Sequence, residues 1–313
     1  LTKIFKKELN KIGGKLIVTD NSPLAPALYQ GDKYYLTPRI NDDNYIEKIL
    51  NICQKEDIKV IIPLLEKSFA NFNQARDLFE KSGIKLFLSS PGVIDLCKDK
   101  YQLYKYFMNI GIPTPETYLP QQANELKYIS FFPLFIKPRS GQGSENTFKI
   151  NKQEELEFFV NYLDDVVIQE FIEGEEFTVD TLSDLKGNVL SAVPRKRIEV
   201  RAGEVSKAVT VRNEKLIDLS VKVIGSLNII GPANLQAKVL PDGEIKIIEI
   251  NPRFGGGVPL SYQSGVNYPL LITRMIRGKK IKPFIGEFQD GLTMLRYDTP
   301  IFKDINDLKG VEE

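Results

Sequence analysis

The stretch EINPRFGGG at residues 249–257 raises the central question of this sequence, because a very apolar segment ends here in polar residues and three glycines. The segment that leads into it, IKIIEI at 245–250, has the composition of a buried strand. A DG pair at 242–243 comes just before, and this pair is a strong short signal for a β-hairpin. The sequence therefore predicts two antiparallel strands that are joined by a tight turn.

The register of this hairpin brings polar side chains together. Counted back from a two-residue turn, Gln236 lies opposite Glu249 and Asn234 lies opposite Asn251, with Cβ atoms about 4.5–5.5 Å apart. Alternation along the strand places Glu249 and Asn251 on the same face as the isoleucines at 245 and 247. We expect Gln236, Glu249 and Asn251 to form an oxygen-rich cluster, which suits Mg²⁺.

Arg253 and the glycines at 255–257 follow this cluster directly. A guanidinium group is well suited to clamp a phosphate, and glycines allow a backbone to approach a ligand closely. The alternative is a polar hairpin end with an ordinary surface salt bridge. We favour the metal and phosphate site, because solvation alone does not explain three convergent oxygen ligands beside an arginine.

Composition excludes several classes of protein. The 313 residues have a net charge of +1, so we expect neither a nucleic-acid partner nor a membrane partner. No apolar run approaches the length of a membrane-spanning helix. The two cysteines, Cys53 and Cys97, indicate reduced thiols in a cytoplasmic protein. Because the chain has no histidine, a Ser-His-Asp triad and a histidine-ligated metal are excluded, and the chemistry must use other groups.

Residues 1–90 alternate between helical and strand patterns. This alternation predicts a parallel sheet covered by helices. The expected helices cover 1–12, 43–56 and 67–83, and the expected strands cover 15–20, 33–38, 59–65 and 84–90. No strand pattern precedes the first helix and the sequence starts at Leu1, so we expect this sheet to lack its first strand.

The pattern changes after residue 90. Two helices are expected up to Gly111, with Asp99 as the N-cap of the second helix. Strands dominate from about residue 128, with hairpin turns at 184–188 and 240–244.

Two lysines in this part are candidates for phosphate binding. Lys137 ends a strand before Pro138, and the following loop SGQGSE at 140–145 has backbone N–H groups that can surround a phosphate. Lys100 stands in the first turn of a helix, where a cation opposes the helix dipole unless an anion binds nearby. The alternatives, a flexible hairpin and an exposed lysine, stay open from these motifs alone.

Two charged segments follow. VVIQEFIEGEEFTVD at 166–180 has an acidic break at Gly174, where Glu170 suits an adenine amino group and Glu176 suits ribose hydroxyls. By itself, this segment is better explained as a solvated acidic turn. VPRKRIEVRAGEVSK at 193–207 includes Arg195, Arg197 and Lys207, which suit either an anionic substrate or a solvated edge strand.

Together, these motifs resemble the ATP-grasp superfamily, and within it the branch of the carbamoyl phosphate synthetase large subunit. The resemblance rests on KDKYQLYKYFMNIGIPTP, FIKPRSGQGS, VIQEFIEGEEFTVD, NLQAKV and IIEINPRFGGG, and it covers about residues 90–275. It implies an α/β protein with a parallel-sheet pre-ATP-grasp domain at 1–90. An α+β ATP-grasp fold would follow at 91–313, with a mobile lid subdomain at about 113–170.

The resemblance also implies roles for individual residues. Lys100 and Lys137 would bind the nucleotide phosphates, and Glu249 would bridge two metal ions held also by Gln236 and Asn251. Arg253, with Lys137 and Asn251, would stabilise the transferred phosphoryl group. The implied nucleotide contacts are Lys100, Lys137, Ser140, Gly141, Gln142, Gly143, Ser144, Gln169, Glu170, Phe171, Ile172, Glu176 and Gln236. The candidate substrate contacts are Arg195, Arg197, Lys207, Gly255 and Gly256.

The implied reaction is the ATP-dependent ligation of a small-molecule carboxylate to an amine or a thiol, through an acyl phosphate, with ATP and Mg²⁺ (or Mn²⁺) as cofactors. The synthetase has two such halves and this chain has one, so a free-standing ligase is expected. The homodimer that is common in the family is the candidate assembly that the resemblance implies. Two alternatives remain: a half-synthetase that uses bicarbonate and ammonia, and a non-catalytic ATP-binding module.

Overall fold

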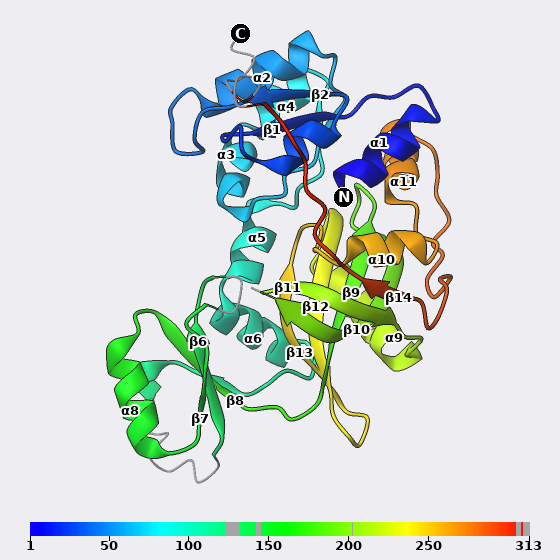
Figure 1. Ribbon diagram of the computed structural model, residues 1–313. Coiled ribbons are helices and arrows are strands. Elements are labelled where there is room, and N and C mark those ends of the chain that lie inside the picture. The colour runs from blue at the N-terminus through cyan, green and yellow to red at the C-terminus, as the bar shows by residue number, and fades with distance from the viewer. Residues whose placement is uncertain (123–131, 142–144, 202, 305–307, 309–313) are drawn as a thin grey trace.

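The computed structural model describes residues 1–122, 132–141, 145–201, 203–304 and 308. Figure 1 shows a small amino-terminal region above two antiparallel sheets, with the larger sheet and its helices on one side and the smaller sheet on the other. Within the described residues, no helix is long and apolar enough to cross a membrane.

The amino-terminal region contains the predicted alternation of helices and strands. Parallel pairing is confirmed for β1 with β2 and for β3 with β4. These are two separate two-stranded sheets, however, and not the single sheet that we expected. The elements are α1 (Thr2–Asn10), β1 (Ile17–Asp20), a 3-10 helix (Pro26–Gln30), β2 (Lys33–Leu36), α2 (Tyr45–Lys55), β3 (Val60–Ile61) and β4 (Lys85–Leu86).

The helix expected over 67–83 is wrong as one element. It is divided into a 3-10 turn (Glu66–Ser68), α3 (Phe69–Gln74) and α4 (Arg76–Lys81). At the division, Arg76 Nη2 donates hydrogen bonds to the carbonyl oxygens of Leu88 (2.8 Å) and Ser89 (3.2 Å). Such tertiary contacts outweigh the local helix preference that the sequence pattern reports.

Two short helices, α5 (Pro91–Lys98) and α6 (Lys100–Asn109), connect the amino-terminal region to the sheets. The predicted N-cap is confirmed, because the Asp99 side chain accepts hydrogen bonds from the backbone N–H groups of Tyr101 (3.0 Å) and Gln102 (3.1 Å). Gly111 follows the helix with a φ of 66°, as a C-terminal glycine does.

The smaller sheet has four antiparallel strands in the order β5-β8-β6-β7. These are β5 (Thr117–Tyr118), β6 (Leu134–Pro138), β7 (Phe148–Ile150) and β8 (Val166–Glu170), with α8 (Gln153–Tyr162) between β7 and β8. Its own small core includes Leu134, Ile136, Ile150, Leu156 and Ile168. This sheet therefore packs as a separate layer from the larger one.

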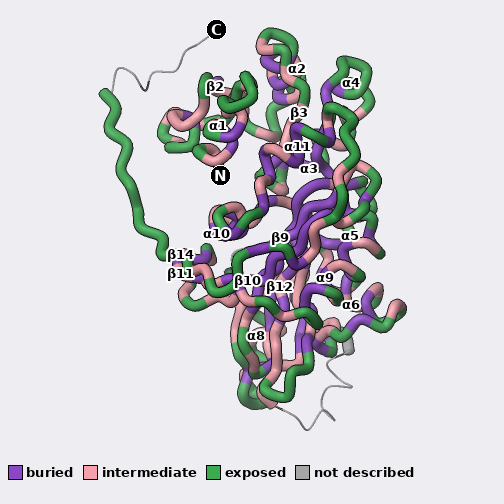
Figure 2. The backbone as a smooth tube through the Cα atoms, turned by 90° about the vertical axis from the view of Figure 1, so that its right-hand side faces the viewer, coloured by how far each residue is buried: buried purple, intermediate pink, exposed green. Residues whose placement is uncertain are grey.

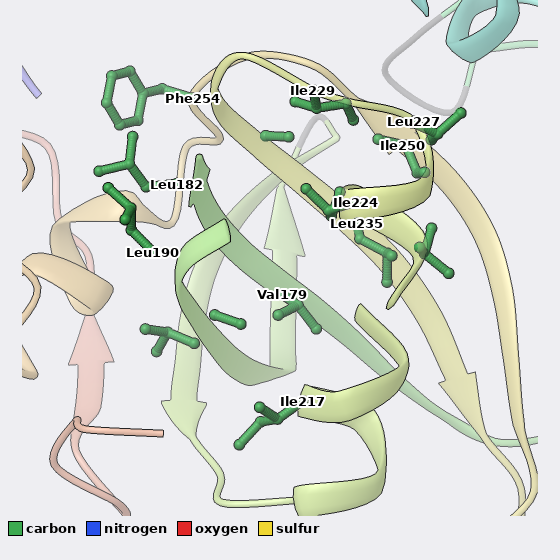
Figure 3. Close-up of a cluster of buried hydrophobic side chains, with 14 of the residues drawn as sticks. Val179, Leu182, Leu190, Ile217, Ile224, Leu227, Ile229, Leu235, Ile250 and Phe254 are labelled. Atoms are coloured by element: carbon green, nitrogen blue, oxygen red, sulfur yellow. The ribbon is translucent and has the colours of Figure 1, made fainter. Parts of the chain in front are cut away.

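The larger sheet has six antiparallel strands in the order β13-β12-β9-β10-β11-β14. They are β9 (Glu175–Ser183), β10 (Val189–Arg201), β11 (Glu204–Thr210), β12 (Gly231–Val239), β13 (Ile245–Asn251) and β14 (Thr293–Leu295). Three helices connect strands of this sheet: α9 (Glu214–Ser226) between β11 and β12, and α10 (Val258–Gln263) with α11 (Tyr268–Ile276) between β13 and β14. The main core lies here, where Val179 and Leu235 of the sheet pack with Ile217 and Ile224 of α9 (Figure 3). In Figure 2 the strands of this sheet are mostly buried.

Helix α1 packs against the larger half of the molecule, although it is expected from the sequence to belong to the first domain. Its Glu8 is buried and accepts hydrogen bonds from Tyr262 Oη (2.7 Å) and Asn267 Nδ2 (2.8 Å). The hydrogen bond from the Lys11 ammonium (2.7 Å), together with these two bonds, lowers the pKa of Glu8 to about 2. Figure 1 shows α1 beside α11.

The hairpin of β12 and β13 confirms the predicted register at its open end. Gln236 pairs with Glu249, and Asn234 pairs with Asn251. The predicted two-residue turn is wrong, because the loop spans 241–243, with Leu240 N bonded to Glu244 O (2.8 Å). A bulge between the pairs at Gln236 and at residue 237 corrects the offset of one residue.

The bulge also changes which side chains share a face. The isoleucines at 245, 247 and 250 belong to the main core. Glu249 instead lines an open cleft. The expectation that Glu249 and Asn251 share a face with residues 245 and 247 is therefore wrong, because the extra residue at 248 inverts the alternation.

Candidate functional site

A cleft of about 900 Å³ is lined by residues of the smaller sheet, the larger sheet and the start of α6. Most of the predicted site residues line it. They are Lys100, Lys137, Ser140, Gly141, Gln169, Glu170, Phe171, Ile172, Glu176, Arg197, Gln236 and Glu249. Three further predicted nucleotide contacts, Gln142, Gly143 and Ser144, lie outside the described residues.

Two buried lysines are the main positive charges of the cleft. Lys100 is 9% exposed and Lys137 is 5% exposed. Burial lowers the pKa of both ammonium groups, and it takes the pKa of Lys137 to about 8, although the nearby Glu249 carboxylate acts in the opposite direction. Among the described residues neither lysine forms an ion pair with a carboxylate, so both charges are available to a bound anion.

The position of Lys100 depends on the loop that follows β6. Arg139 in this loop makes a two-point ion pair with the N-cap residue Asp99, with distances of 2.9 Å from Nε and 2.6 Å from Nη2. The backbone N–H of Lys100 donates to Arg139 O (3.1 Å), and its Nζ donates to Gly141 O (3.1 Å). These contacts tie the first turn of α6 to the end of β6. The motif KPRS contains Arg139, but its partner could not be identified from the sequence.

The three predicted metal ligands lie close together at the open end of the hairpin. Asn251 is buried and its Nδ2 donates to Glu249 Oε1 (3.0 Å) and to Asn234 Oδ1 (3.3 Å). Gln236 is the cross-strand partner of Glu249. Within the described part of the chain, no three histidine, cysteine or acidic side chains gather as a metal site. One carboxylate with two amides nevertheless fits Mg²⁺, which takes oxygen ligands from a bound nucleotide as well.

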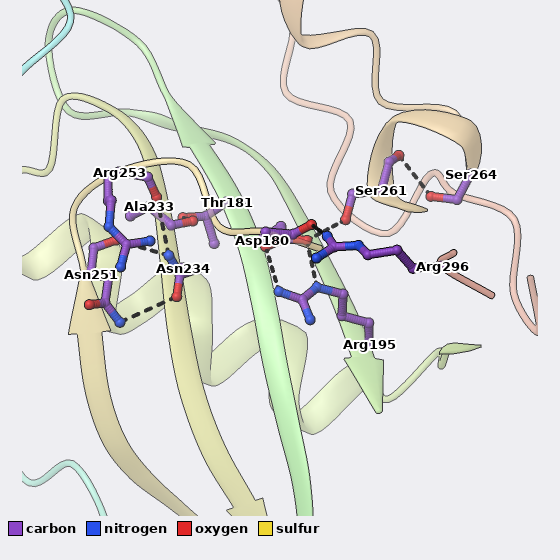
Figure 4. A network of polar contacts seen from close by, with 11 residues as sticks. Asp180, Thr181, Arg195, Ala233, Asn234, Asn251, Arg253, Ser261, Ser264 and Arg296 are labelled. Carbon is purple, nitrogen blue, oxygen red and sulfur yellow. Dashed lines mark hydrogen bonds and ion pairs between the residues drawn. The ribbon is translucent and has the colours of Figure 1, made fainter. Parts of the chain in front are cut away.

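Arg253 approaches the same end of the hairpin and meets a residue that we did not predict. Its Nε donates to Glu66 Oε1 (2.9 Å), and its carbonyl oxygen accepts from Asn234 Nδ2 (3.2 Å). Figure 4 shows Arg253 beside Asn234 and Asn251. Burial raises the pKa of Glu66, while the Arg253 guanidinium acts against this rise. A carboxylate directly after a strand of the parallel pattern, at 59–65, was the available sequence signal.

The two predicted nucleotide carboxylates already have partners in the protein. Glu170 accepts two hydrogen bonds from Lys246 Nζ, both at 2.7 Å. Glu176 forms an ion pair with Arg197, a predicted substrate contact, whose Nε is buried and has no hydrogen-bond partner among the described residues. Lys238 also lines the cleft beside them and was not predicted.

Arg195 is not among the residues that line the cleft, so its role as a substrate contact stays a prediction. It is 3% exposed, and its guanidinium is bonded to Asp180, which is 1% exposed, with Nε to Oδ2 at 2.8 Å. Ser261 Oγ also donates to this carboxylate (2.6 Å), as Figure 4 shows. Lys207 is outside the cleft lining as well, and it forms an ion pair with Glu199 (2.6 Å).

The glycines after Arg253 approach protein side chains, and not an open ligand space. A Cβ atom on Gly257 would lie 2.1 Å from Cζ of Arg195, and one on Gly256 would lie 1.7 Å from Oε2 of Glu204. Gly255 lies against Asn234 and Asp180, with Cβ contacts of 3.3 and 3.4 Å. This close packing accounts for small residues at 255 and 256, and their role as substrate contacts stays a prediction.

Comparison with known sequences agrees with this geometry. Residues 1–87 match a model described as the PylC-like, N-terminal domain. The carbamoyl phosphate synthase large chain of Thermoanaerobacter sp. (strain X514) is 25% identical over 295 residues, which cover 88% of this chain and 27% of the relative. The chain thus spans about a quarter of the length of this relative.

Solved structures share the fold. The biotin carboxylase domain of the Hydrogenobacter thermophilus 2-oxoglutarate carboxylase, in complex with MgADP, ADP and bicarbonate, superposes with a TM-score of 0.75 at 18% identity, over 93% of this chain and 70% of that one. The L-amino acid ligase of Bacillus licheniformis superposes with a TM-score of 0.68 at 20% identity, over 94% and 76%. Residues 97–257, more than half of the chain, match the model described as the ATP-grasp domain, and the protein therefore belongs to the ATP-grasp family.

Proposed function

We propose that this protein is an ATP-dependent ligase that joins a small-molecule carboxylate to an amine or a thiol through an acyl phosphate. The observation that carries the proposal is the cleft in which the buried Lys100 and Lys137 share a lining with Gln236 and Glu249. Among the described residues, these two buried lysines have no carboxylate partner, and they lie beside a set of oxygen donors. Such a site fits a magnesium nucleotide, because the phosphates would compensate the lysine charges and the oxygen donors would bind the metal ion.

ATP and Mg²⁺ are the proposed cofactors. MgADP in the H. thermophilus neighbour supports them, and Mn²⁺ is expected to replace Mg²⁺, since both ions accept oxygen ligands. Gln236, Glu249 and Asn251 would hold the metal, which neutralises phosphate charge when it is bound. The hinge between the two sheets, with Gln169, Phe171 and Ile172, would hold the adenine base.

The proposed chemistry needs positioning and charge stabilisation. An oxygen of the substrate carboxylate attacks the γ-phosphorus, the bond to the β-phosphate oxygen breaks, and ADP leaves. The nitrogen of an amine then attacks the acyl carbon, the acyl carbon–oxygen bond breaks, and phosphate leaves as the nitrogen loses a proton to solvent. Lys137, Lys100 and Arg253 would stabilise the charge on the transferred phosphoryl group, which requires no side-chain nucleophile.

The proposal also includes the organisation of the chain. We place one domain at 1–90 and the ATP-grasp domain at 91–313, with residues 113–170 as a subdomain that closes over the nucleotide. The separate core of the smaller sheet supports this division. A homodimer is the proposed assembly, since the H. thermophilus domain is a dimer, and a cytoplasmic location is consistent with two free, buried cysteines.

The first experiment measures release of ADP and phosphate from MgATP by the purified protein. Substrates are pooled amino acids with other carboxylates, and, separately, bicarbonate with ammonia. Release that requires a pool supports the ligase, whereas release with bicarbonate and ammonia alone supports the half-synthetase. Tight MgATP binding without release in either mixture favours an ATP-binding module.

Matched variants assign any release to this cleft. Glu249→Ala and Arg253→Ala should each abolish release while the circular dichroism spectrum stays unchanged. Glu244→Ala, an exposed carboxylate near the turn of the same hairpin, should keep the wild-type rate. Activity retained by both cleft variants would contradict the proposed mechanism.

A further inference from the structure

Glu66 is a residue of the amino-terminal region that enters the proposed active site. It opens the 3-10 turn Glu66–Ser68, and its Oε1 accepts a hydrogen bond from Arg253 Nε at 2.9 Å. Both side chains of the pair are only 19% exposed. The contact joins positions 187 residues apart in the chain, so the tertiary structure alone creates it.

The backbone that carries Glu66 is held firmly by the core of its own region. Ser68 Oγ donates to the carbonyl oxygen of Leu65 (2.7 Å), and Ser68 is 3% exposed. Phe69 follows directly and is 1% exposed in the core that also contains Phe72 and Phe79. The Glu66 carboxylate is thus presented from a fixed point, not from a free loop.

Arg253 is held at its backbone, and its guanidinium makes two contacts, one from Nη1 to the Phe254 carbonyl oxygen (3.1 Å) and one from Nε to the Glu66 carboxylate. The Arg253 carbonyl oxygen accepts from Asn234, the cross-strand partner of Asn251. An arginine side chain has several rotatable bonds, and a carboxylate that bonds to Nε fixes the plane of the guanidinium. The negative charge of Glu66 also favours the charged form of Lys100, against the lowering of the Lys100 pKa by burial.

We propose that Glu66 is a positioning residue, which orients the Arg253 guanidinium toward the phosphoryl group in transfer and so makes the amino-terminal region part of the active site. This rests on the proposed function, because it requires Arg253 to contact that phosphoryl group. A donor fixed in advance stabilises a transition state more than one that must first be ordered. Binding of the ground-state nucleotide needs no such orientation.

The test uses MgADP with aluminium fluoride, which together mimic a phosphoryl group in transfer and need no identified substrate. Calorimetry on the full chain compares the wild type with Glu66→Gln, Arg253→Ala and the double variant. Glu66→Gln should leave MgADP affinity within about twofold and weaken the aluminium fluoride complex about tenfold. The double variant should bind aluminium fluoride no more weakly than Arg253→Ala alone, because Glu66 acts only through Arg253.

A matched control removes a carboxylate from the same region. Glu80, which is 54% exposed near Arg76, is replaced in Glu80→Gln, and wild-type binding of both ligands is expected. Glu66→Asp should recover part of the lost affinity, because the negative charge remains. Thermal melting of each variant shows whether it is folded.

The outcomes separate this inference from the proposed function. If the wild type does not bind MgADP, the proposed function fails and this inference fails with it. If the wild type forms the aluminium fluoride complex and Glu66→Gln forms it equally well, the positioning role is overturned and the proposed function stands. Additive losses in the double variant, or equal losses of MgADP and aluminium fluoride affinity, would show an ordinary structural ion pair.

Discussion

Two kinds of buried cation in this protein differ in whether a carboxylate of the protein pairs with them. Lys100 and Lys137 line the cleft and form no ion pair with a carboxylate in the part of the chain that the structure describes. Arg195, on β10, is equally buried but is bonded to Asp180. The comparison indicates that burial alone does not single out a candidate ligand-binding cation, because among the described residues it is the lack of a carboxylate partner that distinguishes Lys100 and Lys137 from Arg195.

The physical reason is the cost of taking a charge out of water. A buried ammonium without a partner is destabilised, which is why burial lowers the pKa of Lys137 to about 8. A buried guanidinium that is paired with a carboxylate has its charge compensated within the fold. An anionic ligand can compensate the charge of Lys137 as Asp180 compensates the charge of Arg195. Substitutions at each of the two cations test this difference.

The largest expected effect is on stability, at the paired site. Arg195→Met should lower the free energy of unfolding by about 3–5 kcal/mol, because Asp180 remains buried without its cation. Urea unfolding followed by circular dichroism measures this, since the chain has no tryptophan. Replacing both partners, Arg195→Met with Asp180→Leu, should restore part of the loss. A loss below about 1 kcal/mol for the single variant would contradict a structural role for the pair.

At Lys137 we expect the opposite: a loss of MgATP affinity with no loss of stability. Lys137→Met should weaken MgATP binding about 10–100-fold, the range for a lost hydrogen bond to a charged group, without lowering the free energy of unfolding. Calorimetry and urea unfolding measure the two quantities on the same samples. The control is Lys98→Met, which removes an exposed lysine near Lys100 and should change neither. If Lys137→Met binds MgATP like the wild type, or is unfolded, the distinction drawn between Lys137 and Arg195 is contradicted.

The pH dependence of MgATP binding should report the same lysine. In the free protein the pKa of Lys137 is about 8, and a bound phosphate raises it, because the anion stabilises the ammonium. Binding above pH 8 therefore takes up a proton, and affinity should fall by up to about tenfold per pH unit. Calorimetry between pH 7 and pH 9.5 measures the slope. In Lys137→Met the dependence of affinity on pH should disappear. An unchanged slope in that variant would show that another group is responsible for the dependence.

The smallest effect is expected at an exposed pair. Lys207 is bonded to Glu199 at 2.6 Å, with side-chain exposures of 41% and 35%. Lys207→Ala should change the free energy of unfolding by less than about 1 kcal/mol, because water and salt screen the pair. MgATP affinity should stay within twofold of the wild type. A tenfold loss of MgATP affinity would instead indicate that Lys207 acts on the bound nucleotide.

Local patterns accounted for much of the fold. The cap at Asp99, the end of α6 near Gly111 and the parallel pairs of the first region follow from residue type and spacing, and the structure confirms them. Periodicity and capping depend on neighbours within a few residues, so the sequence contains them in readable form.

The hairpin shows how a local argument can reach the right site by a wrong path. The turn is one residue longer than a two-residue loop, and a bulge at residue 248 restores the register before Glu249. A bulge depends on packing against the neighbouring strand and the core, which a count along one strand does not include. The opposite pairs were therefore predicted correctly, and the faces were not.

By itself, the sequence determined the order of the elements, the hairpin that carries Glu249 and the residue types of the cleft. Only the tertiary structure decided which charges are paired: Arg253 with Glu66, Arg195 with Asp180, and Glu176 with Arg197. These partners lie on different elements, separated by up to 187 residues. Packing between distant parts of the chain creates the pair of Arg253 and Glu66, which has no signature in the spacing of residues, whereas the other two pairs lie across the neighbouring strands β9 and β10, 15 and 21 residues apart in the chain.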